Sequence, residues 1–380
     1  MKLRVDRDAL ADAVAWTAKS LPPRPSVPVL AGALLTVSEG RLTISGFDYE
    51  VSSQVNLDVS SDASGTALVS GKLLAEIVKA LPAKPVDIAA DGSHVELTCG
   101  SARFTLPQMP VEDYPTLPQM PDSVGVVDAA AFAAAVAQTA VAAGKDDTLP
   151  TMTGVQLELT PTGIALLATD RYRMALKDLA WRPGNGDLEV TTLIPAKALS
   201  DTAKALGAQG GEVTIAMPDA SDGPVGMVGF ASADRRTTSR VLDGQLPPLR
   251  SLLPTSFAAE LRVETAELIS VARRVALVTE RNSQLRLTFD VDGLVVEAGG
   301  AEDAKASEAL DCQYSGEPMK VAFNPQYLLD GLSAISAPGA VFSFTEPGKP
   351  VVLTGSVISD DDETDYSGYR YMLQPLRFDS

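Results

Sequence analysis

The chain has 380 residues, of which 45% are hydrophobic and 5% aromatic. This length exceeds that of one typical domain and predicts two or three. The formal net charge of −18 argues against a simple basic DNA-binding domain, although an acidic protein can still carry a local basic face for phosphates.

No apolar run approaches the roughly 20 residues of a membrane-spanning helix. The N-terminal segment MKLRVDRDAL lacks the apolar core of a signal peptide, so we expect a cytoplasmic protein. Cys99 and Cys312 lie in separate strand-like segments, which favours buried thiols over a disulfide or a metal site.

A first pattern occurs three times, at Leu3–Ala18, Gly125–Ala140 and Glu260–Ala276. Each copy predicts a short strand followed by a helix with an apolar face, and the copies recur after roughly 120 to 135 residues, a domain-sized period. An acidic residue stands at each expected helix start, which is favourable there: Asp6, Asp128 and Glu264.

Alternating strand patterns follow each of these helices, around turns at Glu39-Gly40, Pro161–Gly163 and Asp292-Gly293. Every domain is then expected to hold two units, each made of a strand, a helix and several antiparallel strands. The prediction is an α+β fold with six helices and roughly two dozen strands.

A second helix pattern also occurs three times, at 69–81, 194–206 and 323–335. The expected starts are Ser70 as N-cap, Pro195 in the first turn, and Asn324 followed by Pro325. Each copy has apolar residues at helical spacing, so that one face can pack on a sheet.

The other face of two of these helices carries a lysine pair. Lys72 and Lys79 are seven residues apart and share a side, and Lys197 and Lys204 occupy the same positions of the second copy. Solvated lysines are the ordinary interpretation for one helix, but their repetition at one register favours a common ligand.

Proline-rich connections, Leu106–Ser123 and Leu242–Ser256, separate the units. We therefore predict domains at 1–122, 123–255 and 256–380.

Five segments in order carry a resemblance that covers the whole chain: Pro23–Gly32, Ala168–Leu176, Asp243–Pro254, Phe323–Leu332 and Tyr371–Arg377. With the triplicated plan, the chain resembles the bacterial sliding clamp family, the β subunit of DNA polymerase III. The resemblance implies three clamp domains per chain and a head-to-tail homodimeric ring, with helices lining the hole and antiparallel sheets outside. Six domains of this size leave an opening of roughly 35 Å, against about 5 Å for three, so only the dimer admits duplex DNA.

The resemblance implies a non-catalytic processivity factor without cofactor or metal. It would encircle double-stranded DNA without reading its sequence and be opened and loaded by an ATP-driven clamp loader. It would bind the replicative polymerase, the clamp loader, other polymerases, ligase and mismatch-repair proteins through short peptide motifs. The lysine pairs would then attract phosphates without reading bases.

The family also implies positions for three sites. DNA-facing positions are Arg24, Lys72, Lys79, Lys197, Lys204, Asn324 and Tyr327. The partner-peptide pocket corresponds to Met152, Thr169, Arg171, Tyr172, Arg173, Met174, Pro247, Leu252, Met372, Leu373, Gln374, Pro375, Leu376 and Arg377. The ring interface corresponds to Phe104, Ala276 and Leu277, although such a cluster could equally be core.

Three features depart from the family. Gln374 stands where methionine is common, Phe378-Asp379-Ser380 extends the usual end, and Leu149-Pro150-Thr151 replaces more aromatic residues of a DNA-facing loop. We therefore expect altered affinity for some partner peptides or pocket-directed inhibitors.

Other interpretations remain open. For an enzyme, His94 is a solvated strand residue, Gly223–Gly229 reads as a hairpin rather than a nucleotide-binding loop, and 360–363 reads as a solvated acidic loop. The remaining alternatives are an acidic peptide-binding scaffold, or a duplicate clamp with altered partner or inhibitor binding.

Overall fold

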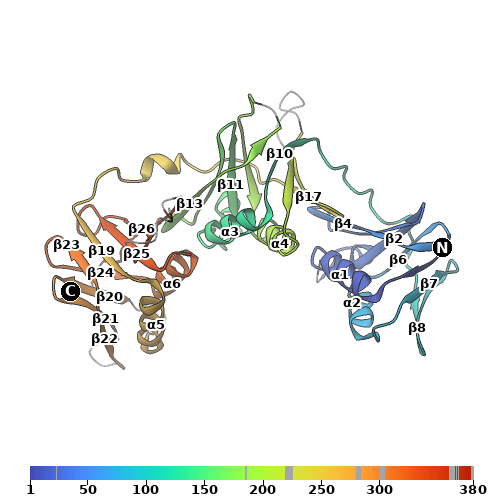
Figure 1. Cartoon of the computed structure of the whole chain (residues 1–380), viewed down its shortest axis with the longest axis horizontal. Coiled ribbons are helices and arrows are strands. Elements are labelled where there is room, and N and C mark those ends of the chain that lie inside the picture. Colours follow the sequence, from blue (N-terminus) through green and yellow to red (C-terminus); the bar gives the residue numbers. More distant parts are fainter. Residues whose placement is uncertain are drawn as a thin grey trace. The chain divides into compact units, whose positions relative to one another are not determined.

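The computed structural model describes residues 1–22, 24–184, 186–218, 226–279, 284–299, 304–358, 364, 366 and 368–377 (Figure 1). The chain forms two compact units. The first consists of Met1–Ala130, Arg182–Gly186 and Asp201–Val241, and the second of Ala131–Trp181, Asp187–Ser200 and Leu242–Ser380.

The predicted six helices are present in the described part of the chain: α1 (Arg7–Ala18), α2 (Gly71–Ala80), α3 (Ala129–Ala140), α4 (Ala196–Gly207), α5 (Thr265–Val275) and α6 (Pro325–Ala334). The starts of α1, α2 and α6 follow from local chemistry, since the side chains of Asp6, Ser70 and Asn324 accept hydrogen bonds from backbone N–H groups of the first turn. Glu264 precedes α5 without such a bond. The prediction for Pro195 was wrong, because this residue ends a strand just before α4 and so lies outside the helix.

The first unit contains two antiparallel sheets, in the orders β5-β1-β7-β8-β9 and β14-β10-β16-β17-β18-β4-β3-β2-β6. Their strands are β1 (Lys2–Val5), β2 (Gly32–Ser38), β3 (Arg41–Phe47), β4 (Val51–Asp58), β5 (Ser60–Ala63), β6 (Gly65–Ser70), β7 (Val86–Ala90), β8 (His94–Cys99), β9 (Ala102–Pro107), β10 (Ser123–Asp128), β14 (Arg182–Pro183), β16 (Glu212–Ala216), β17 (Met227–Ser232) and β18 (Arg235–Arg240).

The second unit also contains two antiparallel sheets, in the orders β15-β11-β12-β13-β27-β26-β25-β19-β23 and β22-β21-β20-β24. Their strands are β11 (Gly154–Thr160), β12 (Gly163–Thr169), β13 (Arg173–Leu179), β15 (Val190–Pro195), β19 (Ala259–Glu264), β20 (Leu285–Asp290), β21 (Gly293–Ala298), β22 (Ala306–Leu310), β23 (Gln313–Ser315), β24 (Met319–Phe323), β25 (Gly339–Phe344), β26 (Val351–Ser356) and β27 (Tyr369–Leu373).

The middle third of the chain contributes strands to both units. In the first unit β18 pairs with β4, with Thr237 opposite Ser53. In the second, β13 pairs with β27, with Ala175 opposite Tyr371. Because both nine-stranded sheets run across the predicted boundaries, the compact units do not follow them, and the boundaries at 122 and 255 stay a prediction.

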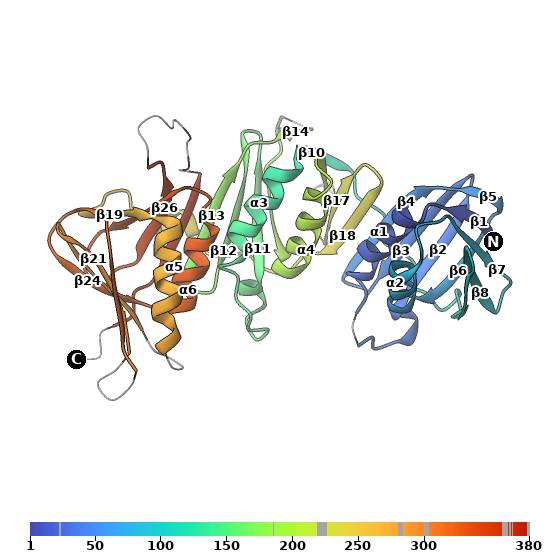
Figure 2. The ribbon, with the colours of Figure 1, turned by 60° about the horizontal axis from the view of Figure 1, so that its bottom comes forward.

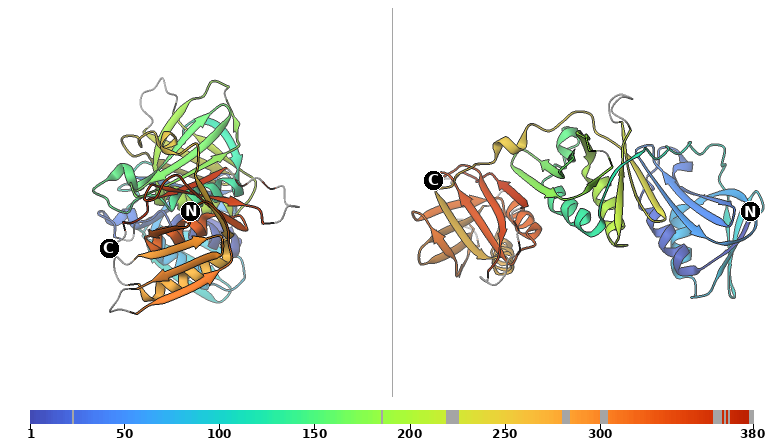
Figure 3. Two further views of the ribbon diagram at one scale, coloured as in Figure 1. Left: turned by 90° about the vertical axis from the view of Figure 1, so that its left-hand side faces the viewer. Right: turned by 45° about the horizontal axis from the view of Figure 1, so that its top comes forward.

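Helices cover one face of the sheets within each unit, as the labels α1 and α2, or α5 and α6, show in Figure 2. α1 packs on α2, β3 and β4, and α5 packs on α6 and β21. Figure 3 shows the same layers from two other directions. The buried sides of these helices and strands form the aliphatic core that the alternating patterns predicted.

The Glu39-Gly40 turn is confirmed, since both residues have positive φ (50° and 75°) between paired Ser38 and Arg41, as a two-residue hairpin loop requires. Both cysteines are free thiols, but Cys312 lies between β22 and β23 rather than in a strand. Within the described residues, no helix is long and apolar enough to cross a bilayer.

Candidate DNA-facing and partner-binding sites

The predicted lysine faces lie on exposed sides of two helices. On α2 the apolar face is buried, and Lys72 and Lys79 are both exposed. On α4 the apolar positions are likewise buried, and Lys197 and Lys204 are exposed. The repeated helix plan therefore presents two pairs of cations to solvent at matching positions.

The third copy of this helix, α6, has no lysines there. It exposes Gln326 and Ser333 at the matching positions. Asn324 serves as its N-cap, because the side-chain oxygen accepts hydrogen bonds from the N–H groups of Gln326 at 2.9 Å and Tyr327 at 3.1 Å. Arg24 is exposed ahead of the 3₁₀ turn Pro28–Ala31.

Tyr327 lies beside residues that the sequence assigned to the partner pocket. Its ring is under the guanidinium of Arg173, with Cζ 4.3 Å from the ring centre. The centroid of the Tyr172 ring lies 6.5 Å from the centroid of the Tyr327 ring. Burial and the neighbouring Asp170 raise the pKa of Tyr327. The sequence did not indicate this contact, because 155 residues separate Tyr172 from Tyr327.

The turn between β12 and β13 presents the pocket residues, and short-range hydrogen bonds hold it. Oδ1 of Asp170 accepts from the N–H groups of Tyr172 and Arg173, both at 3.0 Å. The hydroxyl of Thr169 donates to the Arg173 carbonyl oxygen at 2.7 Å. This geometry leaves Tyr172 57% exposed, while Arg171 takes a positive φ of 78°.

Arg173 is only 6% exposed and is part of a buried polar network. Its Nε lies 2.9 Å from Oδ2 of Asp170, and its Nη1 lies 2.6 Å from Oδ2 of Asp330. Burial alone would lower the pKa of Arg173, but Tyr371 and the two carboxylates outweigh it and the net pKa is raised. Arg173 is therefore a fixed cation, and Arg171 is the exposed arginine of the turn.

Tyr371 completes this network from β27. Its hydroxyl donates to the Tyr327 carbonyl oxygen at 2.8 Å, and Nη1 of Arg173 lies 3.5 Å from the same hydroxyl. Burial raises the pKa of Tyr371, so the phenol stays neutral at physiological pH. The ring packs on Gly331 of α6, where any Cβ would overlap the tyrosine ring.

Methionine and leucine form an apolar cluster beside the turn. Met174 is buried there together with Leu246 and Leu249, and Met152 and Met372 pack against them. Leu252 is 54% exposed. Of the remaining predicted pocket residues, Pro247, Gln374, Leu376 and Arg377 are exposed, and Leu373 and Pro375 are buried. The predicted set therefore contains both a supporting interior and an accessible apolar rim.

The last described residues tie both sheets of the second unit together. The N–H of Gln374 donates to the Tyr172 carbonyl oxygen at 2.9 Å, and the N–H of Leu376 donates to the Ala322 carbonyl oxygen at 2.8 Å. The Arg377 carbonyl oxygen accepts from Nε2 of Gln284 at 2.9 Å. Residues 378–380 lie outside the described part of the chain.

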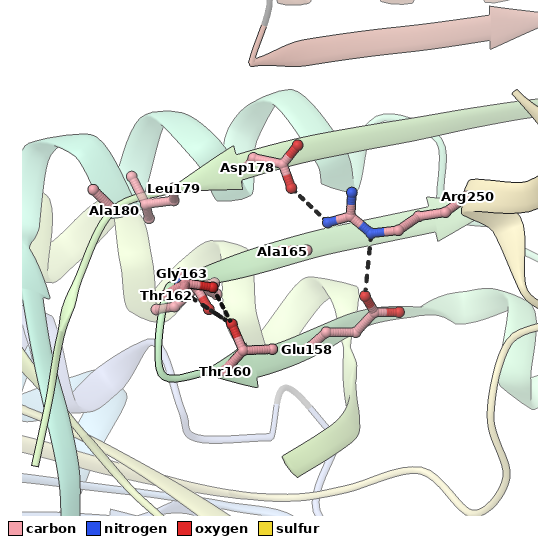
Figure 4. A pocket seen from close by; sticks show the side chains of 10 residues that line it. Glu158, Thr160, Thr162, Gly163, Ala165, Asp178, Leu179, Ala180 and Arg250 are labelled. Atoms are coloured by element: carbon pink, nitrogen blue, oxygen red, sulfur yellow. Dashed lines mark hydrogen bonds and ion pairs between the residues drawn. The ribbon is translucent and has the colours of Figure 1, made fainter. Parts of the chain in front are cut away.

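A separate cavity of about 540 Å³ lies on β11, β12 and β13 (Figure 4). Arg250 reaches across it, with Nε 3.4 Å from Oε2 of Glu158 and Nη2 2.5 Å from Oδ1 of Asp178. Burial would lower the pKa of Arg250, but Asp178 and Glu158 raise it. None of the residues lining this cavity belongs to the predicted pocket.

The residues expected at a ring interface are accessible. Phe104 is 37% exposed on β9, the last strand of its sheet. Leu277 is 84% exposed just after α5, and Ala276 beside it is half-buried. β22 is likewise an edge strand. Both edges have unpaired backbone groups that a second chain could pair with.

The chain has one histidine, His94, and it lies in the described residues. His94 is an exposed residue at the start of β8, where its Nδ1 lies 2.8 Å from the Ser93 hydroxyl, as predicted for a solvated position. Across those same residues no cluster of three metal-binding side chains is present. The acidic segment 360–363 and residues 223–225 of the glycine-rich segment fall outside them, while 227–229 belong to β17.

Three models of protein families match the chain in succession: the N-terminal domain of the DNA polymerase III β subunit at residues 1–118, its central domain at 126–248 and its C-terminal domain at 250–365. The chain belongs to the β sliding clamp family. It is therefore related to proteins of DNA replication, and its three-domain α+β fold is that of this family.

Comparisons with individual β sliding clamps support the same family. The β sliding clamp of Streptomyces coelicolor is 49% identical, over 99% of both chains. A β sliding clamp homolog of Streptomyces muensis is 41% identical over the full length of both. A crystal structure of a sliding clamp from Pseudomonas aeruginosa bound to griselimycin has a TM-score of 0.89 with 24% identity and covers all of both chains, which supports the fold.

Proposed function

We propose that two copies of this chain close head to tail into a ring around duplex DNA, and that the ring tethers the replicative polymerase and other replication and repair proteins without catalysing a reaction. The observation that carries the proposal is the pair of matching, exposed lysine faces on α2 and α4 of a sliding-clamp chain. Lysine ammonium groups attract phosphates at any sequence, as a sliding contact requires.

The proposed ring contact joins the β9 edge of one chain to the last third of another. Two edge strands, β9 and β22, and the accessible apolar side chains of Phe104 and Leu277 support it. A heterologous contact of this kind closes only if the rotation returns to the first copy, which two chains of three domains would satisfy.

The proposed partner site consists of the Asp170–Arg173 turn, the apolar cluster around Met174 and the end of β27. An exposed tyrosine, an exposed arginine and adaptable methionines suit short apolar peptides of several sequences. Tyr327 joins this site in the proposal because of its contacts with Tyr172 and Arg173. Its assignment to DNA rests on the family resemblance alone.

The test is retention on DNA after loading by a bacterial clamp loader with ATP. Protein on nicked circular plasmid is compared with protein on the same plasmid linearised, through a wash at high salt. We expect retention on circles and loss from linear ends, because a topological link survives salt that screens phosphate contacts. Equal loss from both, by a dimeric and loader-competent protein, would instead favour the acidic peptide-binding scaffold.

The lysine faces are tested in the same assay. Replacing Lys72, Lys79, Lys197 and Lys204 by alanine should slow loading and reduce its salt dependence, since four phosphate-attracting lysines are removed from each chain of the ring. The control replaces the exposed Lys84 and Lys349 by alanine and should load normally. Normal loading of the fourfold variant would show that these lysine faces do not contribute to loading on DNA.

A further inference from the structure

The partner site and helix α6 are joined by a short chain of hydrogen bonds through Asp330. Oδ2 of Asp330 accepts from Nη1 of Arg173 at 2.6 Å, and Oδ1 accepts from Nε2 of Gln326 at 2.7 Å. Each carboxylate oxygen of Asp330 thus accepts a hydrogen bond from a different side chain. Arg173 belongs to the partner-site turn, and Gln326 lies on the exposed side of α6.

Arg173 cannot hold its position without acidic partners. The guanidinium is almost fully buried, and an unpaired buried cation is strongly destabilising. Asp170 belongs to the same turn and moves with it, so it cannot fix the turn to the rest of the unit. Asp330, together with the ring of Tyr327 beneath the guanidinium, gives the turn a reference point on α6.

The position of this turn decides how Tyr172 is presented. Tyr172 precedes Arg173 directly, and its carbonyl oxygen accepts from the N–H of Gln374 at the end of β27. Two walls of the partner site, the turn and the end of β27, therefore depend on where Arg173 is held. An exposed aromatic ring that is fixed in advance loses less conformational entropy when a peptide binds.

Asp330 also differs from its counterparts in the repeated helix plan. Glu76 of α2 and Asp201 of α4 occupy the same position, five residues after the first residue of the helix. Glu76 is exposed. In α6 the acid at this position accepts a hydrogen bond from Arg173 on the partner-site turn.

We propose that Asp330 is a positioning residue of the partner site: by holding Arg173 it fixes the Asp170–Arg173 turn, so that Tyr172 meets a bound peptide in one orientation. This rests on the proposed function of the site. Asp330 does not itself contact the peptide, and its effect passes through Arg173.

The test measures binding of the purified replicative polymerase of the same bacterium, and of a synthetic peptide of its clamp-binding segment, to the full-length protein. We expect Asp330→Asn to weaken both about tenfold, mainly through faster dissociation. Glu76→Gln, the matched change on α2, should leave both unchanged. If Asp330→Asn does not fold, Asp330→Glu keeps the charge and should still weaken binding, because its longer side chain displaces the guanidinium.

A double-mutant cycle separates positioning from general damage. In an Arg173→Met background, Asp330→Asn should cause no further loss of peptide affinity, because the residue through which it acts is gone. An additional tenfold loss in that background would overturn the proposal. In sedimentation velocity Asp330→Asn should remain a dimer like the unmodified protein, and dissociation into monomers would indicate a defect of the whole ring and also overturn the proposal.

Binding by the unmodified protein separates the function of the site from the role of Asp330. If the unmodified protein binds neither polymerase nor peptide, the proposed function of the site is wrong. If the unmodified protein binds both and Asp330→Asn binds them equally well, the site is correct and the positioning role is wrong.

Discussion

The side-chain amide of Gln374 donates a hydrogen bond to the carbonyl oxygen of Gly348 at 3.2 Å. The end of β27 is thereby connected to the turn between β25 and β26, where Gly348 has a φ of +79°. Gln374 thus gives the proposed partner site a polar hydrogen bond at a place where the methionine expected from the family resemblance would leave an apolar, flexible side chain.

We expect Gln374→Met to bind apolar partner peptides roughly three- to tenfold more tightly, because it removes an exposed amide and adds apolar contact area. Isothermal titration calorimetry of both proteins with the same set of partner peptides would measure the change in affinity. Gln313→Met, at an exposed position of β23, is the matched control. Unchanged peptide and inhibitor affinities would refute the expectation that Gln374 alters this site.

The proposed ring interface predicts that one charged side chain placed in it separates the dimer into monomers. Leu277→Lys should convert the dimer to monomers, since burying a leucine contributes about 1.5 to 3 kcal/mol and burying an unpaired lysine is unfavourable. Val291→Lys is the control, because Val291 is 81% exposed in the same unit at the β20–β21 turn. Sedimentation velocity distinguishes the two, and a Leu277→Lys protein that remains dimeric would exclude this interface.

The stability of the protein should fall in alkaline solution partly because of Tyr114. Burial raises the pKa of Tyr114 to about 12, against about 10 in an unfolded chain. The folded state keeps this proton after the unfolded state has lost it. The associated stability is therefore complete below pH 10 and declines as the pH rises towards 12.

Replacing this residue should flatten that decline. Tyr114→Phe cannot ionise, and its removal of a buried hydroxyl without a hydrogen-bond partner among the described residues should cost little at pH 7. Urea unfolding at pH 8, 10 and 11 measures the slope. Identical slopes for both proteins would contradict the assignment.

Replacing Gly331 by alanine should destabilise the protein, although the same substitution usually stabilises a helix. Alanine in a helix interior is usually favoured over glycine by about 0.5 to 1 kcal/mol. At Gly331 the added Cβ would overlap the Tyr371 ring, so we expect Gly331→Ala to destabilise the protein by about 1 to 3 kcal/mol. Ser333→Ala, on the exposed side of α6, should be neutral or stabilising. Thermal unfolding compares them, and a more stable Gly331→Ala protein would show that the ring can move.

Features fixed by neighbouring residues were predictable from the sequence. Ser70 as an N-cap and the exposed positions of Lys72 and Lys79 depend only on helical spacing and capping chemistry, which act within one or two turns. The Glu39-Gly40 hairpin depends on two consecutive residues with positive φ. These local rules and the repeated plan were sufficient for the α+β class and the six helices.

Features that depend on distant residues were not predictable in this way. The family resemblance placed Arg173 in the partner-peptide pocket but gave no sign that it is buried against Asp330, which lies 157 residues away in sequence. The cavity under Arg250 likewise depends on Glu158 and Asp178, which are 92 and 72 residues away. The family resemblance supplied Tyr327 as a DNA-facing residue and gave no sign of its contact with Tyr172.

The contact between Gly331 and Tyr371 constrains how this chain can diverge from its relatives. The matching positions of the other two helices hold Ile77 and Thr202, so a larger side chain is compatible with the helix plan itself. In α6 a bulkier residue requires a smaller one at position 371, and a smaller residue there removes the hydroxyl that links Arg173 to Tyr327. Substitutions at these two positions should therefore be inherited together, and an alignment of many relatives would reveal them as a covarying pair.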